Sequence, residues 1–85
     1  MEQTEYFKRR VLRERPFIRL DWCERTVREP EATETQPDGR IRYWRFIPEL
    51  GKPLRVIPQP DGTTLHNAFP DRSFKPGDSA EPVAP

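Results

Sequence analysis

The N-terminal part of the chain repeats its apolar residues with the period of an α-helix. Phe7 and Val11 lie four positions apart, which places both side chains on one face of a helix from Glu5 to about Glu14. Thr4 is a residue type that caps helix starts, and Pro16 forces an end because the residue before a proline avoids the helical conformation. We therefore expect a first short helix with an apolar inner face.

A second helix is predicted from Asp21-Trp22-Cys23-Glu24, in which a capping residue precedes a Glu by three positions. This helix is expected to run to about Glu29 and to stop at Pro30. The helical period predicts a buried stripe made of Trp22, Cys23, Thr26 and Val27.

After Pro30 the pattern changes to short β-branched and aromatic runs separated by turn residues. The tetrad Gln-Pro-Asp-Gly occurs at 36–39 and again at 59–62, and Asp-Gly at the centre of a two-residue loop favours a β-hairpin. The pattern predicts strands near 31–36, 40–47, 54–59 and 63–69. The expected fold is α+β, with two short N-terminal helices packed on a four-stranded antiparallel β-meander.

The length of 85 residues supports one small domain, which we place at residues 1–77. Apolar residues make up 33% and charged residues 34%, so the core should be thin although nine aromatic residues contribute to it. A thin core gains stability from a partner, which makes a dimer or a heteromeric complex an alternative to a monomer. Residues 78–85 are poor in large apolar side chains and are expected to form a flexible tail.

Targeting signals and metal sites are not predicted. The N-terminus lacks the basic and apolar stretches of a signal peptide, and the chain lacks a long apolar run, so we expect a cytoplasmic protein that does not enter a membrane. One cysteine, Cys23, and one histidine, His66, among scattered carboxylates do not form a familiar metal-ligand spacing. We expect neither cofactor nor metal, and we expect Cys23 to be a buried core residue.

The second hairpin gives a testable register. Counting outward from an Asp61-Gly62 turn pairs Ile57 with His66, and it continues to a pair of Leu54 with Phe69. One face then carries the apolar set Leu54, Val56, Leu65 and Phe69. The other face carries Arg55 and His66 as diagonal neighbours, together with Ile57, Thr64 and Ala68.

The strand at 40–47 is apolar on both faces, so its orientation stays open. If Ile41, Tyr43 and Ile47 point inward, then Arg42, Trp44 and Phe46 join the face of Arg55. Otherwise Tyr43 and Arg45 join it. Either orientation places arginine beside an aromatic ring, a combination that suits both single-stranded RNA and a protein partner.

Charge is unevenly distributed although the net charge is +1. Residues 1–28 hold eight Lys/Arg and five Asp/Glu, residues 29–39 hold four acids and no base, and residues 40–55 hold five bases and one acid. The basic block on the predicted strands can form a patch.

Several segments resemble a small bacterial family of unknown function that is grouped with the RelE-like and BrnT-like toxins of type II toxin–antitoxin systems. The resemblance covers about residues 5–75. It rests on Arg13-Glu14-Arg15, Val27-Arg28-Glu29-Pro30-Glu31, Pro37-Asp38-Gly39-Arg40-Ile41-Arg42-Tyr43-Trp44, Gly51-Lys52-Pro53-Leu54-Arg55-Val56 and Phe69-Pro70-Asp71. The resemblance implies a compact α+β domain that cuts messenger RNA without a metal and is covered by a small antitoxin protein.

Three function hypotheses follow. The first is a metal-independent endoribonuclease of a toxin–antitoxin pair. In this hypothesis His66 acts as acid or base, Arg55 holds the phosphate, and Tyr43 positions the RNA or donates a proton. RNA would then be bound by Arg42, Trp44 and Arg45. The second is a non-catalytic protein- or RNA-binding module that uses the same face. The third is an accessory subunit that makes contact through its helices and tail.

Overall fold

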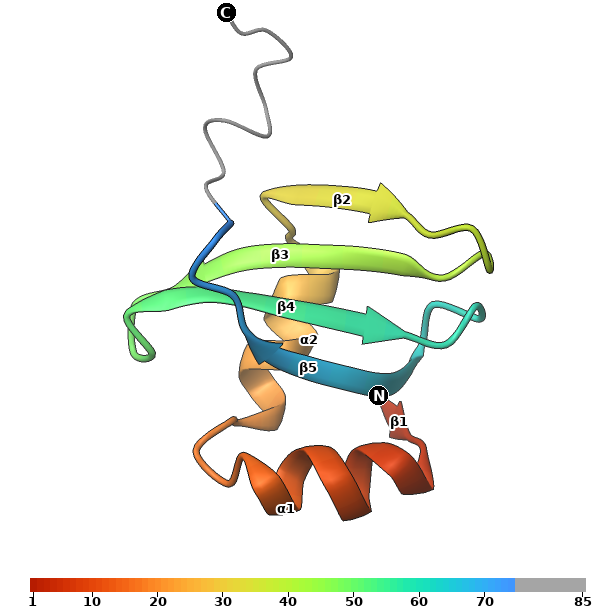
Figure 1. Ribbon diagram of the computed structural model, residues 1–85, viewed down its shortest axis with the longest axis horizontal. Helices are drawn as coiled ribbons and strands as arrows, with labels where there is room; N and C mark the ends of the chain where they lie inside the picture. The colour runs from red at the N-terminus through yellow and green to blue at the C-terminus, as the bar shows by residue number, and fades with distance from the viewer. Residues whose placement is uncertain (75–85) are drawn as a thin grey trace, which may run out of the picture.

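A computed structural model describes residues 1–74, so the tail predicted at 78–85 lies outside the described residues. Within residues 1–74, helical segments pack against one face of a five-stranded sheet (Figure 1). The strands, in their spatial order, are β1 (Glu2–Gln3), β5 (Thr64–Pro70), β4 (Lys52–Pro58), β3 (Ile41–Ile47) and β2 (Ala32–Thr35). The predicted α+β class is confirmed, but the sheet has one strand more than predicted and is mixed.

The additional strand is β1, which runs parallel to β5. Glu2 pairs with Thr64 and Gln3 with Leu65, and the Thr4 N–H donates to the Leu65 carbonyl at 3.0 Å. The sequence did not reveal this strand because two polar residues have no alternating pattern. The pairing brings the start of the chain to the edge of the last strand.

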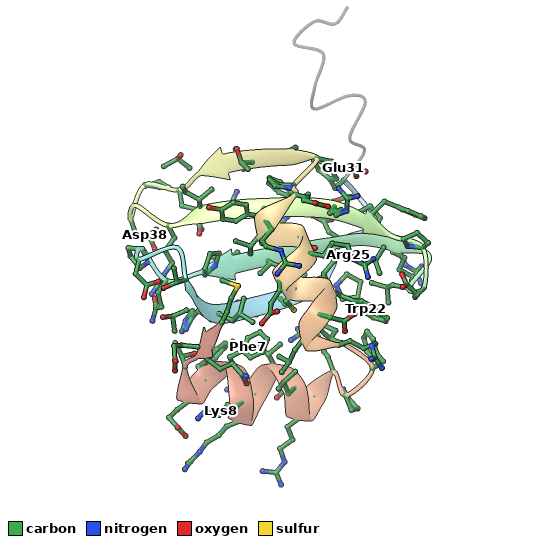
Figure 2. All side chains as sticks on the ribbon, turned by 180° about the vertical axis from the view of Figure 1, so that it is seen from behind. Phe7, Lys8, Trp22, Arg25, Glu31 and Asp38 are labelled. Atoms are coloured by element: carbon green, nitrogen blue, oxygen red, sulfur yellow. The ribbon has the colours of Figure 1, made fainter. Side chains whose placement is uncertain are left out.

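The N-terminal helix occupies residues 5–14 and confirms the predicted first helix. It comprises the π-helical segment η1 (Phe7–Val11) and the short α1 (Leu12–Glu14). Thr4 caps it as expected, since its hydroxyl accepts the Phe7 N–H at 3.0 Å. Figure 2 shows Phe7 pointing toward the sheet and Lys8 pointing away from it.

The second helix, α2 (Leu20–Arg28), begins two residues earlier than predicted, because its N-cap is Arg19 and not Asp21. The Asp21 carboxylate bonds to Arg19 Nε at 3.1 Å, so the predicted capping by Asp21 is wrong. The predicted inner stripe is confirmed: Trp22, Cys23 and Thr26 are buried and Val27 packs on the core.

Both hairpin turns centre on Pro-Asp, one residue before the predicted Asp-Gly centre. Gln36 O accepts the Gly39 N–H at 3.0 Å, and Gln59 O accepts the Gly62 N–H at 2.9 Å. Proline fixes a negative φ at the first central position, which excludes the predicted mirror-image turn. Each Gly follows the turn with a positive φ, +93° and +74°, which is the arrangement of a turn with an adjacent glycine bulge.

A second irregularity shifts the predicted register of β4 and β5. Pro58 pairs with Leu65 as predicted, but Ile57 then pairs with Asn67, so His66 is the extra residue of a bulge. Pro58 has no N–H to give to the ladder, and the Asn67 side chain accepts the Ala68 N–H at 2.9 Å. A missing donor on one strand and a local acceptor on the other explain why the bulge lies here.

The bulge exchanges the faces of the sheet on which Ala68 and Phe69 were predicted to lie. Ala68 pairs with core residue Val56 and is fully buried, whereas Phe69 pairs with Arg55 on the opposite face. The predicted inward position of Phe69 and outward position of Ala68 are therefore wrong. Leu54, Val56 and Leu65 do face the helices as predicted.

Strand β3 adopts the first of the two predicted orientations. Tyr43 pairs with Val56 and Arg45 with Leu54, and directly paired residues share a face, so both point to the helix side with Ile47. The face turned away from the helices, called the open face below, carries Arg42, Trp44, Phe46, Arg55, Ile57 and Phe69. The core between sheet and helices contains Phe7, Val11, Ile18, Trp22, Cys23, Ile47, Leu54, Val56, Leu65 and Ala68.

The bulge can be tested by two substitutions on the same strand. Leu65→Ala should lower the free energy of unfolding by about 2–5 kcal/mol because it removes a fully buried core side chain. Phe69→Ala should cost less than Leu65→Ala, since Phe69 lies outside the core. Urea unfolding followed by circular dichroism measures both, and a larger loss for Phe69→Ala would contradict the register.

Candidate functional site

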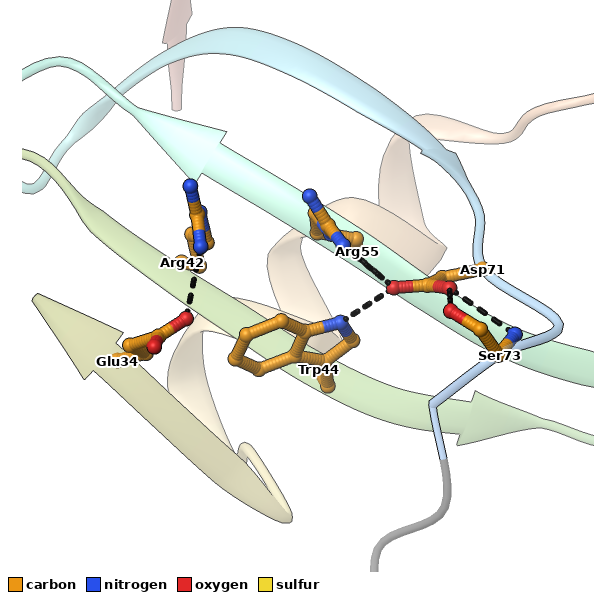
Figure 3. Close-up of polar contacts among 6 residues, drawn as sticks. All are labelled: Glu34, Arg42, Trp44, Arg55, Asp71 and Ser73. Carbon is orange, nitrogen blue, oxygen red and sulfur yellow. Dashed lines mark hydrogen bonds and ion pairs between the residues drawn. The ribbon is translucent and has the colours of Figure 1, made fainter. Parts of the chain in front are cut away.

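The Asp71 carboxylate organises the polar contacts of the open face. Its Oδ2 accepts the Trp44 Nε1–H at 3.0 Å and the Arg55 guanidinium at 2.7 and 3.2 Å (Figure 3). Its Oδ1 accepts the Ser73 N–H and hydroxyl at 3.1 and 2.7 Å. Asp71 is 7% exposed, and its N–H donates to the Pro53 carbonyl of β4 at 2.9 Å. These bonds tie the segment after β5 to the two central strands.

The same segment covers an aromatic ring. After β5 the chain crosses over β4 toward β3 (Figure 1), and Phe74 stacks on Trp44 with ring centroids 4.7 Å apart and planes 6° apart. Trp44 lies on the open face yet is only 6% exposed. The predicted RNA-binding tryptophan is therefore in the expected place but is covered by a residue of its own chain.

Burial of the Asp71 carboxyl opposes its ionisation, but its surroundings reverse that effect. Hydrogen bonds from Ser73, Trp44 and Arg55, with the charge of Arg55, hold the pKa of Asp71 well below its usual range. Asp71 is thus an anion at neutral pH, and Arg55 is its counter-ion.

Arginines and aromatic rings alternate from the end of the N-terminal helix into the open face. The Arg15 guanidinium carbon lies 5.7 Å from the Phe69 ring centroid, and that of Arg55 lies 4.9 Å from Phe69 and 5.3 Å from Trp44. Phe74 ends the series by stacking on Trp44. We call this series Arg15–Phe69–Arg55–Trp44–Phe74 the stacked ladder; each cation–π contact is worth about 0.5–2 kcal/mol.

The other arginines of the open face are also paired with carbonyl or carboxylate oxygens. Arg42 bonds to Glu34 of the neighbouring strand at 2.8 Å, while its Nε is buried and has no hydrogen-bond partner among the described residues. Arg40 bonds to Asp38 at 3.2 Å and to Gln59 Oε1 at 2.9 and 3.1 Å. Partly exposed pairs of this kind contribute about 0–1 kcal/mol, so a phosphate can compete for such arginines.

His66 lies at the edge of the sheet beside the start of the chain. Its Nδ1 is 3.1 Å from the Thr4 hydroxyl, and its ring stacks on Tyr6 at a centroid distance of 4.9 Å. Burial, followed by the charge of Arg40, lowers the pKa of His66. The bulge makes Phe69 the partner of Arg55, so the predicted diagonal pair of Arg55 and His66 does not form.

The predicted site residues thus fall into three groups. Arg42, Trp44 and Arg55 share the open face, and His66 is separated from them at the edge of β5. Tyr43 and Arg45 lie on the helix side of β3, where Arg45 donates to the carbonyl of Glu29 at the end of α2 at 2.6 Å. The predicted catalytic set of His66, Arg55 and Tyr43 is therefore distributed over two faces.

Sequence reasoning missed Asp71 and Phe74 as parts of this site. The segment Asp71-Arg72-Ser73 contains a local signal, since an Asp that accepts the N–H two residues later is a common turn. That signal predicts the turn but not the contacts with Trp44 and Arg55, which depend on how the chain leaves β5.

A second surface carries a local excess of positive charge. Residues 5–19 hold six Lys/Arg and two Asp/Glu, a net charge of +4 in a chain whose net charge is +1. The solvent side of the N-terminal helix, called the basic surface below, presents Lys8, Arg9, Arg10 and Arg13. Arg9 is the most exposed of the ion-paired residues, with its side chain 80% exposed. The four acids of residues 29–38 lie in or next to β2, the strand at the other edge of the sheet: Glu29 caps α2, Glu31 precedes β2, Glu34 lies in β2 and Asp38 lies in the turn after it.

Two further properties of the described residues concern metal ions and membranes. Among residues 1–74, no group of three or more His, Cys, Asp or Glu side chains is arranged to hold a metal ion. Within the same described part of the chain, none of the helices has the length and apolar character to cross a membrane.

No family model matches the chain, and no curated protein or solved structure matches it either. The resemblance to RelE-like and BrnT-like toxins therefore stays a prediction.

Asp71 gives a prediction with a defined pH dependence. Asp71→Asn should lower the free energy of unfolding at pH 7 by about 2–3 kcal/mol, because charge-assisted hydrogen bonds to Arg55 and Trp44 are weakened. A depressed carboxyl pKa contributes stability above the usual pKa of 3.8, and this contribution is lost as the pH falls below it. The difference between parent and variant should therefore shrink below about pH 4 in urea titrations. Asp38→Asn, which alters an exposed ion pair, should change the free energy of unfolding by less than about 0.5 kcal/mol both at pH 7 and below about pH 4.

Cys23 gives a second prediction. Burial, with the nearby charges of Glu24 and Asp21, raises the pKa of the Cys23 thiol to about 12. The folded protein should not react with Ellman's reagent at pH 8 within an hour, whereas the urea-unfolded protein should react within minutes. Rapid reaction of the folded protein would show that the helix–sheet core opens readily.

Proposed function

We propose that this domain is a non-catalytic module that binds single-stranded nucleic acid. The single observation that carries the proposal is the charge asymmetry: a net +4 over residues 5–19, which form the N-terminal helix and the segment directly after it, in a chain of net charge +1. The phosphate backbone of a polynucleotide is attracted to such a surface independently of sequence.

The arrangement around the basic surface supports a single strand over a duplex. The stacked ladder starts at Arg15, directly after this helix, and leads to the Trp44 ring on the open face. Exposed Phe17 follows Arg15 in the chain. Rings interleaved with arginines suit unpaired bases, because any base can stack on a ring while its phosphate contacts a cation.

The placement of the predicted catalytic residues supports binding without cleavage. A metal-independent ribonuclease needs a base, an acid and a cation around one phosphate. Tyr43 is on the helix side of the sheet, His66 is held by Thr4 and Tyr6 at the edge, and Arg55 is neutralised by Asp71. The proposal therefore keeps the predicted RNA interaction and replaces the predicted endoribonuclease activity.

The proposal is tested by fluorescence anisotropy with a labelled mixed-sequence 20-mer of RNA, in EDTA. The variant Arg9→Gln/Arg13→Gln should bind at least about tenfold more weakly at low salt than the parent. Its plot of log K against log salt should be shallower by about 1.4, since each lost phosphate contact removes about 0.7 for single strands. DNA of the same sequence should behave similarly, because the backbone charge is shared.

The matched control, Arg28→Gln/Lys52→Gln, removes the same charge from positions outside the basic surface and the stacked ladder and should change affinity less than about twofold. Equal loss in both variants, or equally tight binding of polyglutamate, would show that the surface does not recognise nucleic acid. If the parent protein cleaves the RNA in EDTA and His66→Ala does not, the endoribonuclease hypothesis would replace the proposal.

A further inference from the structure

The contact between Phe74 and Trp44 has the geometry of a ligand contact made within the chain. The rings are 4.7 Å apart and within 6° of parallel, which is the arrangement in which an unpaired base stacks on tryptophan. Trp44 is oriented from its edge by the hydrogen bond to Asp71, so removal of Phe74 would leave the ring in place. The platform is therefore preorganised, and one removable side chain covers it.

We infer that Trp44 is a base-binding platform which Phe74 occupies in the free protein and which a base of the bound strand takes over. This inference rests on the proposed function and names the position where one base is stacked. Its occupant is an unpaired base, because the neighbouring groups fit a nucleotide: the Arg55 guanidinium carbon lies over the Trp44 ring, 5.3 Å from its centroid, and Arg42 lies two residues along β3.

The anchoring of Phe74 is weak enough for exchange. Its N–H donates to the Asp71 carbonyl at the long distance of 3.3 Å, whereas the Asp71 side chain is held by Trp44, Arg55 and Ser73 independently of the Phe74 ring. Phe74 lies outside the hydrophobic core. Displacing the ring therefore requires neither opening the core nor breaking the ion pair.

Arg42 supplies the partner of the phosphate. Its pair with Glu34 is partly exposed, with side chains 31% and 59% accessible, and its Nε has no partner among the described residues. A phosphate beside the stacked base would give this guanidinium a second acceptor. The ladder from Arg15 then connects this position to the basic surface.

Phe74→Ala tests the inference because it empties the platform. Its affinity for the 20-mer single strand should rise about three- to tenfold, and the gain should vanish in Phe74→Ala/Trp44→Ala. Its affinity for a 20-base-pair duplex should stay within about twofold, since paired bases cannot reach the ring. Phe46→Ala, which removes an exposed ring two residues from Trp44 on the same face, should leave both affinities unchanged.

A direct readout uses adenosine monophosphate and tryptophan fluorescence. The nucleotide should quench Phe74→Ala more strongly than the parent, and Phe74→Ala/Trp44→Phe should lose this quenching while Trp22 still fluoresces. Circular dichroism checks that each variant is folded. Unchanged or weaker single-strand binding by folded Phe74→Ala would overturn the platform, and it would leave the proposed function standing if Arg9→Gln/Arg13→Gln is still impaired. Quenching by the nucleotide without any binding of the 20-mer would instead keep the platform and reject the proposed function.

Discussion

The open face depends on the hydrogen bonds and the ion pair that the buried carboxylate of Asp71 forms. One oxygen orients Trp44 and neutralises Arg55, and the other fixes the turn to Ser73. Removing a buried carboxylate from water is unfavourable unless its acceptors are filled, and here five hydrogen-bond contacts fill them. The result is a sheet face that is nearly neutral although it contains Arg42 and Arg55.

That neutrality changes how the surface is interpreted. A row of arginines along strands resembles a nucleic-acid surface in sequence, but Glu34 and Asp71 compensate Arg42 and Arg55 in space. The excess positive charge lies on the N-terminal helix and on the segment directly after it. Long-range attraction and close recognition are therefore assigned to different parts of the molecule, which the stacked ladder connects.

Local patterns predicted the fold well where one pattern had one structural solution. The spacing of Phe7 and Val11 fixed the inner face of the first helix, and the stripe around Trp22 fixed that of the second. The predictions were wrong where contacts between residues distant in sequence determined the structure. The bulge at His66 exchanged Ala68 and Phe69 between faces, and Asp71 found its partners 16 and 27 residues away. Pro58 and Asn67 were sequence signals from which the bulge could have been predicted. No sequence signal predicted that Phe74 covers Trp44.

The pairing of β1 with β5 has a consequence for the order of folding. It joins Glu2 to Thr64, so the chain must close a loop that contains most of its described residues. In return, only two residues of each strand become paired. The adjacent strands β3, β4 and β5 are joined by short turns and can pair first. The N-terminal strand can dock only after β5 has formed, so amide exchange at residues 2–4 should be the earliest reporter of partial unfolding.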